Sequence, residues 1–495
     1  MTFPRHTRAT RREWIGLAVI ALPCLLYAMD LTVLTLAVPS LTEDLRPSAT
    51  ELLWIVDIYG FLVAGFLITM GTLGDRIGRR RLLLVGAAAF GAASVVAAFA
   101  TTPEMLIASR AVLGIAGATL APSTLSLIRS MFEDPHQRTV AIGIWIASFS
   151  AGAAIGPLVG GVLLEQFWWG SVFLLAVPVM AGLLLVGPRL LPEYRDPNPG
   201  RLDLVSVALS LTAVLGVIYG IKSVATGGAS AVAIAVTSAG LAIGVAFVAR
   251  QRRMADPMID LGLFSKPGFS AALGANLLGF AVVFGLDVFI AQYLQLVLGY
   301  SPLAAGLWSM PAAIAFVVGS QLTPPLSARV RPALLMLGGL ALALVGAAVI
   351  TQAQATSGPA VVVSGVVILS LGFAPLFTLA ADLAVGSAPP ERAGAAAGIS
   401  ETSSELGGAL GLALLGTIGT AVYQAGAPGS ETLAEVTRTD LLTPAREAFT
   451  EALQVTAGVS AAIVGAAALL VATLVWRPSH ATVEEGVDFG CARSS

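Results

Sequence analysis

Long apolar runs dominate the chain and constrain its fold more than any other feature of the sequence. Each run has 18 or more residues, close to the ~20 that an α-helix needs to cross a bilayer. Because backbone polar groups in lipid must bond internally, the runs predict helices. They lie at residues 14–38, 52–73, 82–100, 103–128, 139–164, 168–187, 204–221, 229–248, 269–298, 302–326, 333–351, 360–384, 394–423 and 448–476. We therefore expect an all-α integral membrane protein with fourteen spanning helices.

The composition agrees with this class and argues against others. Of 495 residues, 56% are hydrophobic and 11% are charged, whereas about 25% of residues are charged in a soluble globular protein. Lys and Arg total 27 against 29 Asp and Glu, so net charge gives no reason to expect a nucleic-acid partner. The three histidines lie far apart in the sequence, and no catalytic Ser/His/Asp set or HExxH motif is present. We expect no metal site, no cofactor and no enzyme activity.

The positive charges predict the orientation in the membrane. Counted over alternate loops, 22 of the 27 Lys and Arg residues fall on one side and four on the other. Cytoplasmic loops carry the excess of positive charge, so both termini are expected in the cytoplasm.

The loop at residues 71–81, G-T-L-G-D-R-I-G-R-R-R, joins the second and third runs. Its glycines permit a tight turn and close helix contacts. Asp75 lies at a helix end, where it can accept charge-assisted hydrogen bonds from an arginine or from a helix N-terminus. We interpret the segment as a gating loop with these residues: Gly71, Gly74, Asp75, Arg76, Gly78 and Arg79.

A degenerate copy of this loop at residues 319–331, without the acid, indicates that the chain contains two related halves. Two six-helix bundles with a site between them near the midplane is a secondary-transporter architecture. The predicted division is 1–190 for the N-terminal bundle, 191–266 for two inserted helices with connectors, 267–478 for the C-terminal bundle and 479–495 for a cytoplasmic tail. Residues 424–446 form an external loop to which we assign no role.

The fifth run contains G-A-A-I-G-P-L-V-G-G at residues 152–161. Gly152, Gly156 and Gly160 recur every fourth residue and form a groove for close helix packing. Pro157 removes a backbone hydrogen bond and bends the helix. The segment serves either tight packing alone or a bend that rocks between two transporter states.

Arg110 lies within the fourth run, where a guanidinium must be paired or face water. Either it bonds backbone carbonyls in a purely structural role, or it tunes the proton affinity of a carboxylate.

Six acids lie within the apolar runs, and several charges at membrane depth indicate a water-accessible cavity. Asp30 lies near the middle of the first run. Glu401 and Glu405 are four residues apart on one helix face, an arrangement that favours proton binding by the pair. Asp57 and Asp287 act either in this site or as structural partners, and for Asp382 we favour a structural role. The candidate residues for proton or cation coupling are Asp30, Glu401, Glu405, Asp57, Asp287 and Arg110.

Aromatic side chains near these acids can stack on a flat organic cation, although aromatics in membrane helices also face lipid or the core. The candidates are Tyr27, Trp54, Tyr59, Phe61, Phe284, Phe289, Tyr293 and Phe377.

Several of these segments resemble motifs of the major facilitator superfamily. Residues 71–81 are similar to its signature loop, G-x-L-[GA]-D-R-x-G-R-[KR]. Residues 152–161 resemble the G-x-x-x-G-P-x-x-G-G motif of drug:proton antiporters, and residues 30–34 resemble the D-x-T-[IV]-[VL] segment of the fourteen-helix branch. Residues 106–114 are similar to L-I-x-x-R-x-x-Q-G, but Leu113 replaces the usual polar residue.

The resemblance is to the QacA-like and LfrA-like multidrug efflux pumps, and it is densest over the first six helices. It implies a monomeric bacterial inner-membrane exporter of lipophilic cations such as quaternary ammoniums, dyes and fluoroquinolones. The proton gradient would be its energy source. Asp30 and the Glu401/Glu405 pair would attract a cation when ionised and release it when protons arrive from outside. The alternative is a carrier of one metabolite, lipid or siderophore on the same fold.

Overall fold

The computed structural model describes residues 9–195, 203–227, 230–254, 257–356, 358–427 and 439–476. The predicted cytoplasmic tail and the middle of the predicted external loop therefore lie outside the described residues. Within the described residues the structure has fourteen helical segments long and apolar enough to span a membrane, as the sequence predicts.

The helices run in the order α1 (Arg11–Leu45), α2 (Ala49–Ile77), α3 (Arg79–Ala98), α4 (Pro103–Gly117), α5 (Leu120–Met131), α6 (Pro135–Gln166), α7 (Ser171–Leu174), α8 (Ala176–Leu190), α9 (Leu204–Gly227), α10 (Ala231–Gln251), η1 (Leu261–Ser265), α11 (Pro267–Gln292), η2 (Tyr293–Val297), α12 (Pro302–Ser327), α13 (Pro332–Ile350), α14 (Ala360–Ser387), η3 (Pro390–Arg392), α15 (Ala393–Gly426) and α16 (Thr439–Trp476).

Three predicted spans are built from more than one helical piece. The fourth run forms α4 and α5 with a break at Ala118–Thr119, and the sixth forms α7 and α8. The ninth ends in the π-helical turn η2. Pro122 explains the first break in part, because it has no N–H to continue the hydrogen-bond ladder of the helix.

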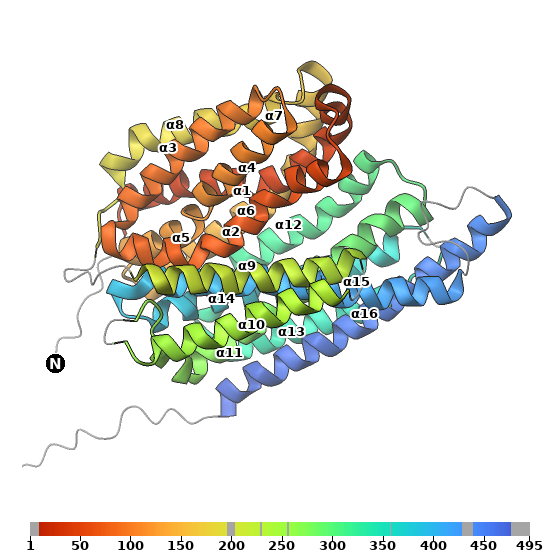
Figure 1. The fold of residues 1–495 in the computed structure, drawn as a ribbon. Helices are drawn as coiled ribbons and strands as arrows, with labels where there is room; N and C mark the ends of the chain where they lie inside the picture. Colours follow the sequence, from red (N-terminus) through yellow and green to blue (C-terminus); the bar gives the residue numbers. More distant parts are fainter. Residues whose placement is uncertain are drawn as a thin grey trace, which may run out of the picture.

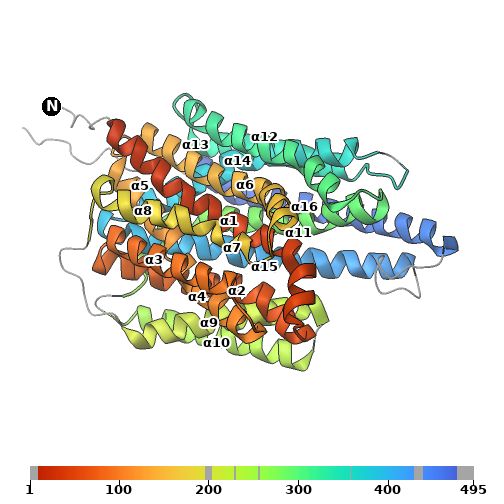
Figure 2. The same cartoon turned by 90° about the horizontal axis from the view of Figure 1, so that it is seen from above.

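The helices form two bundles (Figures 1 and 2). Helices α1–α8 share one apolar core, which includes Ile20, Tyr59 and Phe90. Helices α11–α16 share a second core, which includes Tyr293, Phe373 and Leu453. The bundles meet mainly where α2 and α5 pack on α15 and where α6 packs on α12 and α14.

The inserted helices lie on one side of the interface between the bundles. Helix α9 packs against α2 of one bundle and α15 of the other, and α10 packs on α9 along one edge of the molecule (Figure 2). The ends of the hairpin are joined by an ion pair of 2.8 Å between Asp203 and Arg250. The hydrogen bond from this guanidinium lowers the pKa of the Asp203 carboxyl to about 2.

Orientation remains a prediction, and reporter fusions test it. Because the positive charges concentrate in the loops on one side, green fluorescent protein fused after residue 495 should fluoresce in the cytoplasm. Alkaline phosphatase at the same position should be inactive, and phosphatase inserted at 430 should be active. An active C-terminal phosphatase fusion would contradict the predicted orientation.

Candidate functional site

Asp30 and Arg110 form a buried ion pair inside the N-terminal bundle. The Arg110 Nη1 atom lies 3.1 Å from Asp30 Oδ2, and the two side chains are 1% and 14% exposed. Nη2 of Arg110 donates to the carbonyl of Val56 at 3.4 Å. The guanidinium also lies over the ring of Tyr59, 5.2 Å from its centroid. Arg110 therefore has both kinds of partner that its sequence position suggests, a backbone carbonyl and a carboxylate.

A small cavity borders Asp30. Its volume is about 20 Å³, which is enough for one water molecule. Phe90 of α3 and Phe173 of α7 line it together with residues of α1 and α8. The carboxylate thus has room for a water beside it, although its surroundings are otherwise apolar.

Glu401 and Glu405 lie on α15, in the other bundle, and face α1. The Tyr27 hydroxyl donates to Glu405 Oε1 at 3.2 Å across the interface between the bundles. Glu401, one turn earlier, lies close enough to Cys24 and Tyr27 of α1 to interact with both electrostatically. The predicted pair on α15 and the predicted acid on α1 are therefore connected by Tyr27, which is three residues before Asp30.

A cluster of phenylalanines in the C-terminal bundle runs from the buried Phe373 and Phe377 to the exposed Phe284. Ring centroids lie 4.4 Å apart for Phe280 and Phe377, 6.0 Å for Phe280 and Phe284, and 6.0 Å for Phe316 and Phe377. Phe373 stacks on Phe377 at 5.5 Å. Of these five rings, only Phe284 and Phe377 were singled out from the sequence. Phe280 could also have been found from the sequence, because it precedes Phe284 by four residues and therefore lies one turn away on the same face of α11.

Asp287 follows Phe284 by one turn of α11, and both side chains are exposed. At Gly408 on α15, an added Cβ would lie 3.2 Å from the Phe284 ring. Because Gly408 is one turn after Glu405, the aromatic cluster extends from the neighbourhood of Glu405 toward Asp287.

The other sequence candidates are placed elsewhere. Trp54 and Phe61 contact each other at 6.4 Å on α2. Tyr293 is fully buried at the far end of α11 and donates to the carbonyl of Gln354 at 2.8 Å. Phe289 packs on Phe449 at 5.9 Å. The side chain of Asp57 lies outside the described residues.

The gating loop contacts the opposite bundle directly. Asp75 accepts hydrogen bonds of 2.9 Å from the backbone N–H groups of Gly394 and Ala395, at the start of α15. The Arg79 guanidinium lies 2.9 Å from the same carboxylate and also donates to the carbonyl of Pro390. Asp75 thus has both of its expected partners, an arginine and a helix N-terminus.

Two glycines of the loop are required by this geometry. A Cβ at Gly71 would collide with the carbonyl of Gly394, so α2 and α15 approach this closely only without a side chain there. Gly78 has φ +109°, a conformation that L side chains rarely adopt. Gly74 and Arg76 are placed on the last turns of α2, with Gly74 buried against α3 and α5.

An ion pair joins the bundles at the same end of the molecule. The Arg138 Nε atom donates to Asp382 Oδ1 at 2.7 Å, and the Thr139 hydroxyl donates to Oδ2 at 2.8 Å. Asp382 therefore has a structural partner, as we favoured from the sequence. We refer to the contacts of Asp75 and Asp382 together as the clamp, and to this end of the molecule as the clamp end.

The glycine-rich segment of α6 packs on α1 beside the Asp30 site. A Cβ at Gly152 would collide with the carbonyl of Leu25, and one at Gly160 would lie 2.8 Å from Val33. Gly156 is buried between them, and the side chain of Pro157 lies outside the described residues. The groove expected from the glycine spacing thus receives the helix that carries Tyr27 and Asp30.

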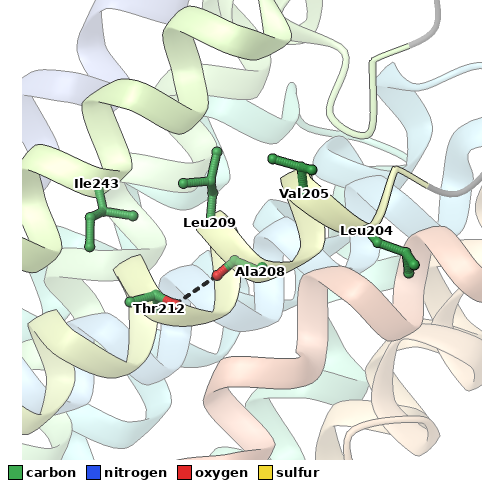
Figure 3. Close-up of a pocket in the computed structure, with 6 residues that line it drawn as sticks. All are labelled: Leu204, Val205, Ala208, Leu209, Thr212 and Ile243. Atoms are coloured by element: carbon green, nitrogen blue, oxygen red, sulfur yellow. Dashed lines mark hydrogen bonds between the residues drawn. The ribbon is translucent and has the colours of Figure 1, made fainter.

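A groove lies away from the acids, along α9 and bordered by α10 (Figure 3). It has a volume of about 350 Å³ and is lined by Leu204, Val205, Ala208, Leu209, Thr212 and Ile243. The hydroxyl of Thr212 donates to the carbonyl of Ala208 at 2.8 Å. The exposed Leu204 and Val205 mark this as a membrane-facing apolar surface rather than a site for a charged substrate.

These features define a membrane transporter built from two helical bundles, and comparisons with known proteins give its family. The model of the Major Facilitator Superfamily matches residues 20–412, so the chain belongs to that superfamily. It is a multi-pass protein of the bacterial inner membrane and a transporter, not an enzyme.

The chain is similar to named drug-resistance proteins. It is 45% identical to the multidrug efflux pump LfrA of Mycolicibacterium smegmatis, over 94% of this chain and 97% of that protein. It is 35% identical to the methyl viologen resistance protein SmvA of Salmonella typhimurium, over 82% of each chain.

Solved structures show the same fold at low sequence identity. The human organic anion transporter MFSD10 (TETRAN) has a TM-score of 0.62 at 17% identity, covering 93% of this chain and 99% of that one. A bacterial homologue of the iron transporter ferroportin, in an outward-facing state, has a TM-score of 0.60 at 14% identity, covering 94% of this chain and all of that one.

Replacing Gly152 by alanine tests the contact of α6 with α1. Because the new methyl group meets the Leu25 backbone, Gly152→Ala should lower the free energy of unfolding by about 1–3 kcal/mol, measured as thermal unfolding in detergent. Gly161→Ala on the same helix is the control, since nothing lies within 4 Å of its Cβ. Equal stability of the two variants would contradict the close contact.

Replacing Asp75 by asparagine tests the clamp. The buried Arg79 loses its counter-ion and α15 loses a charged acceptor, so the clamp end should open more often. The reporter is Ala397→Cys in a Cys491→Ser background, and the side chain at position 397 is fully buried. We expect a water-soluble maleimide to label this cysteine at least tenfold faster when Asp75→Asn is added. Asp203→Asn, in the inserted hairpin, is the matched control. An unchanged labelling rate would show that Asp75 does not hold this end closed.

Proposed function

We propose that the protein is a proton-coupled multidrug exporter of lipophilic cations. The observation that carries this proposal is the pair of acidic centres on either side of the interface between the bundles. Asp30 lies in one bundle with Arg110, and Glu405 lies in the other with Glu401 one turn away. The efflux and resistance activities in the names of LfrA and SmvA support the same function for this chain.

The substrate site in this proposal combines the phenylalanine cluster with the flanking acids. The rings of Phe280, Phe284 and Phe377 give flat apolar surfaces on which an aromatic cation can stack. In this proposal, carboxylates at Glu405 and Asp287 supply negative charge near Phe284. Stacking on rings tolerates many shapes, which is consistent with a broad range of substrates.

The acids supply the coupling. An ionised carboxylate attracts the cation, and protonation removes that attraction, so cation and proton compete for the same negative charge. The membrane potential alone contributes ~2.3 kcal/mol per charge per 100 mV to the inward movement of the proton. Alternating movement of the two bundles would expose the competing groups first to the cytoplasm and then to the outside.

Ethidium efflux from cells expressing the full chain tests the proposal. We expect efflux that stops when a protonophore removes the gradient, because the proton is the energy source. Asp30→Asn removes a titrating group without a large change of shape and should slow efflux at least tenfold. Glu104→Gln, an exposed acid at the start of α4, should leave the rate unchanged.

Three outcomes would count against the proposal. One is efflux that persists without a gradient, and another is a wild-type rate in Asp30→Asn. The third is that cells with and without the protein resist the same drugs, while a single metabolite accumulates. This result would favour a dedicated carrier on the same fold.

A further inference from the structure

The hydrogen bond between Tyr27 and Glu405 crosses from one bundle to the other about midway along both helices. Tyr27 lies in the middle of α1 and Glu405 near the middle of α15, 378 residues apart in the chain. The donor and acceptor atoms are 3.2 Å apart. The contact is therefore made or broken as the two bundles move relative to each other.

The N-terminal bundle fixes the Tyr27 ring independently of this bond. The ring centroid lies 5.9 Å from that of Tyr59 and 5.7 Å from that of Phe149 on α6. Tyr27 is 8% exposed. Because the N-terminal bundle holds the ring in place, the hydroxyl contacts Glu405 of the opposite bundle from a fixed position.

Titratable and charged groups from several helices surround the contact. Tyr27 and Asp30 share one turn of α1 and move together, and the Tyr59 ring lies between Tyr27 and the guanidinium of Arg110. The hydroxyl of Tyr59 is buried without a hydrogen-bond partner among the described residues. The groups facing the contact are Cys24, Asp30, Tyr59, Arg110 and Glu401.

The strength of this bond depends on the charge of Glu405. A hydroxyl donating to an ionised carboxylate makes a stronger bond than one donating to a neutral carboxyl group. When Glu405 gains a proton, its attraction for the Tyr27 hydroxyl weakens and α1 is held less firmly against α15.

We propose that Tyr27 is a proton-sensing latch between the bundles, a positioning residue for the transport cycle. While Glu405 is ionised, the latch supports the arrangement in which the clamp end is closed. Protonation of Glu405 releases the latch and permits the clamp end to open. This inference rests on the proposed function, in which Glu405 takes up the transported proton.

The latch would enforce coupling after a substrate has been released. An exporter that returned to its loading state without a proton would dissipate no gradient and would carry substrate in either direction. A latch that stays closed until Glu405 is protonated makes the return step conditional on proton uptake.

Spin labels on the two bundles test the latch without any substrate. The labels are placed by Arg81→Cys and Val330→Cys, two exposed positions at the clamp end, with Cys491→Ser and the buried Cys24 retained. Interspin distances are measured on the full chain in nanodiscs from about pH 5 to about pH 9, a range that spans the titration of carboxyl groups in apolar surroundings.

In the wild type, we expect the ratio of closed to open forms at the clamp end to rise with pH. Tyr27→Phe keeps the ring and removes the donor, so it should lower the ratio about tenfold at high pH and leave it unchanged at low pH. Glu405→Gln should give the low ratio at every pH, and adding Tyr27→Phe to it should have no further effect. Tyr219→Phe, on the exposed face of α9, should behave as the wild type.

Two results would overturn the latch. One is an unchanged pH response in Tyr27→Phe, and the other is an equal shift at every pH, which would indicate that the hydroxyl only contributes to packing. The proposed function is judged separately, by ethidium efflux of the wild type in the same lipid. If the wild type exports ethidium but Tyr27→Phe keeps the wild-type pH response of the interspin distances, the latch is wrong and the proposed function stands. If Tyr27→Phe changes the pH response as expected but the wild type exports no ethidium, the proposed function is wrong and the latch stands.

Discussion

A charge inside a membrane must be paired, and the arrangement of this molecule depends on where those pairs are made. Arg110 is buried with Asp30 inside one bundle, and Asp75 is buried with Arg79 and the N-terminus of α15 between the bundles. Removing one partner of such a pair leaves an uncompensated charge, so each pair is strongly maintained. The contacts that cross between the bundles differ in one respect, because movement of the bundles separates Asp75 from the N-terminus of α15 and Arg138 from Asp382. They therefore stabilise one arrangement of the transporter rather than the fold as a whole.

The clamp and the central acids divide the interface between the bundles into two parts. At the clamp end, Asp75 and Asp382 hold α15 and α14 against the N-terminal bundle. Near the middle, the interface contains Tyr27 and the acids that are candidates for proton binding. The inserted helix α9 packs across the junction of α2 and α15, whereas α6 and α12 meet on the other side with no inserted helix over them among the described residues. The two sides of the interface therefore differ in structure.

Much of this architecture follows from the sequence, because it is set by local patterns. Run lengths give the number of spanning helices, and the glycines at 152 and 160 predict a close helix contact without naming α1 as the partner. The chemistry of Asp75 at a helix end predicts the kind of partner it binds. Partners distant in the chain are not encoded in this way. The pairing of Arg110 with Asp30, of Tyr27 with Glu405, and of Phe280 with Phe377 depends on how bundles pack, which no local period specifies. The break between α4 and α5 was also not predicted, since the apolar run continues across it.

The central claim is that substrate cations and protons compete for the acids at the interface, and proton release on substrate binding tests it most directly. Purified protein in weakly buffered detergent solution is mixed with ethidium, and the pH of the solution is followed with an indicator dye. The account predicts release of protons in the wild type, and a strongly reduced release when Asp30→Asn and Glu405→Gln are combined. Ethidium binding with no change of pH in the wild type would contradict the account.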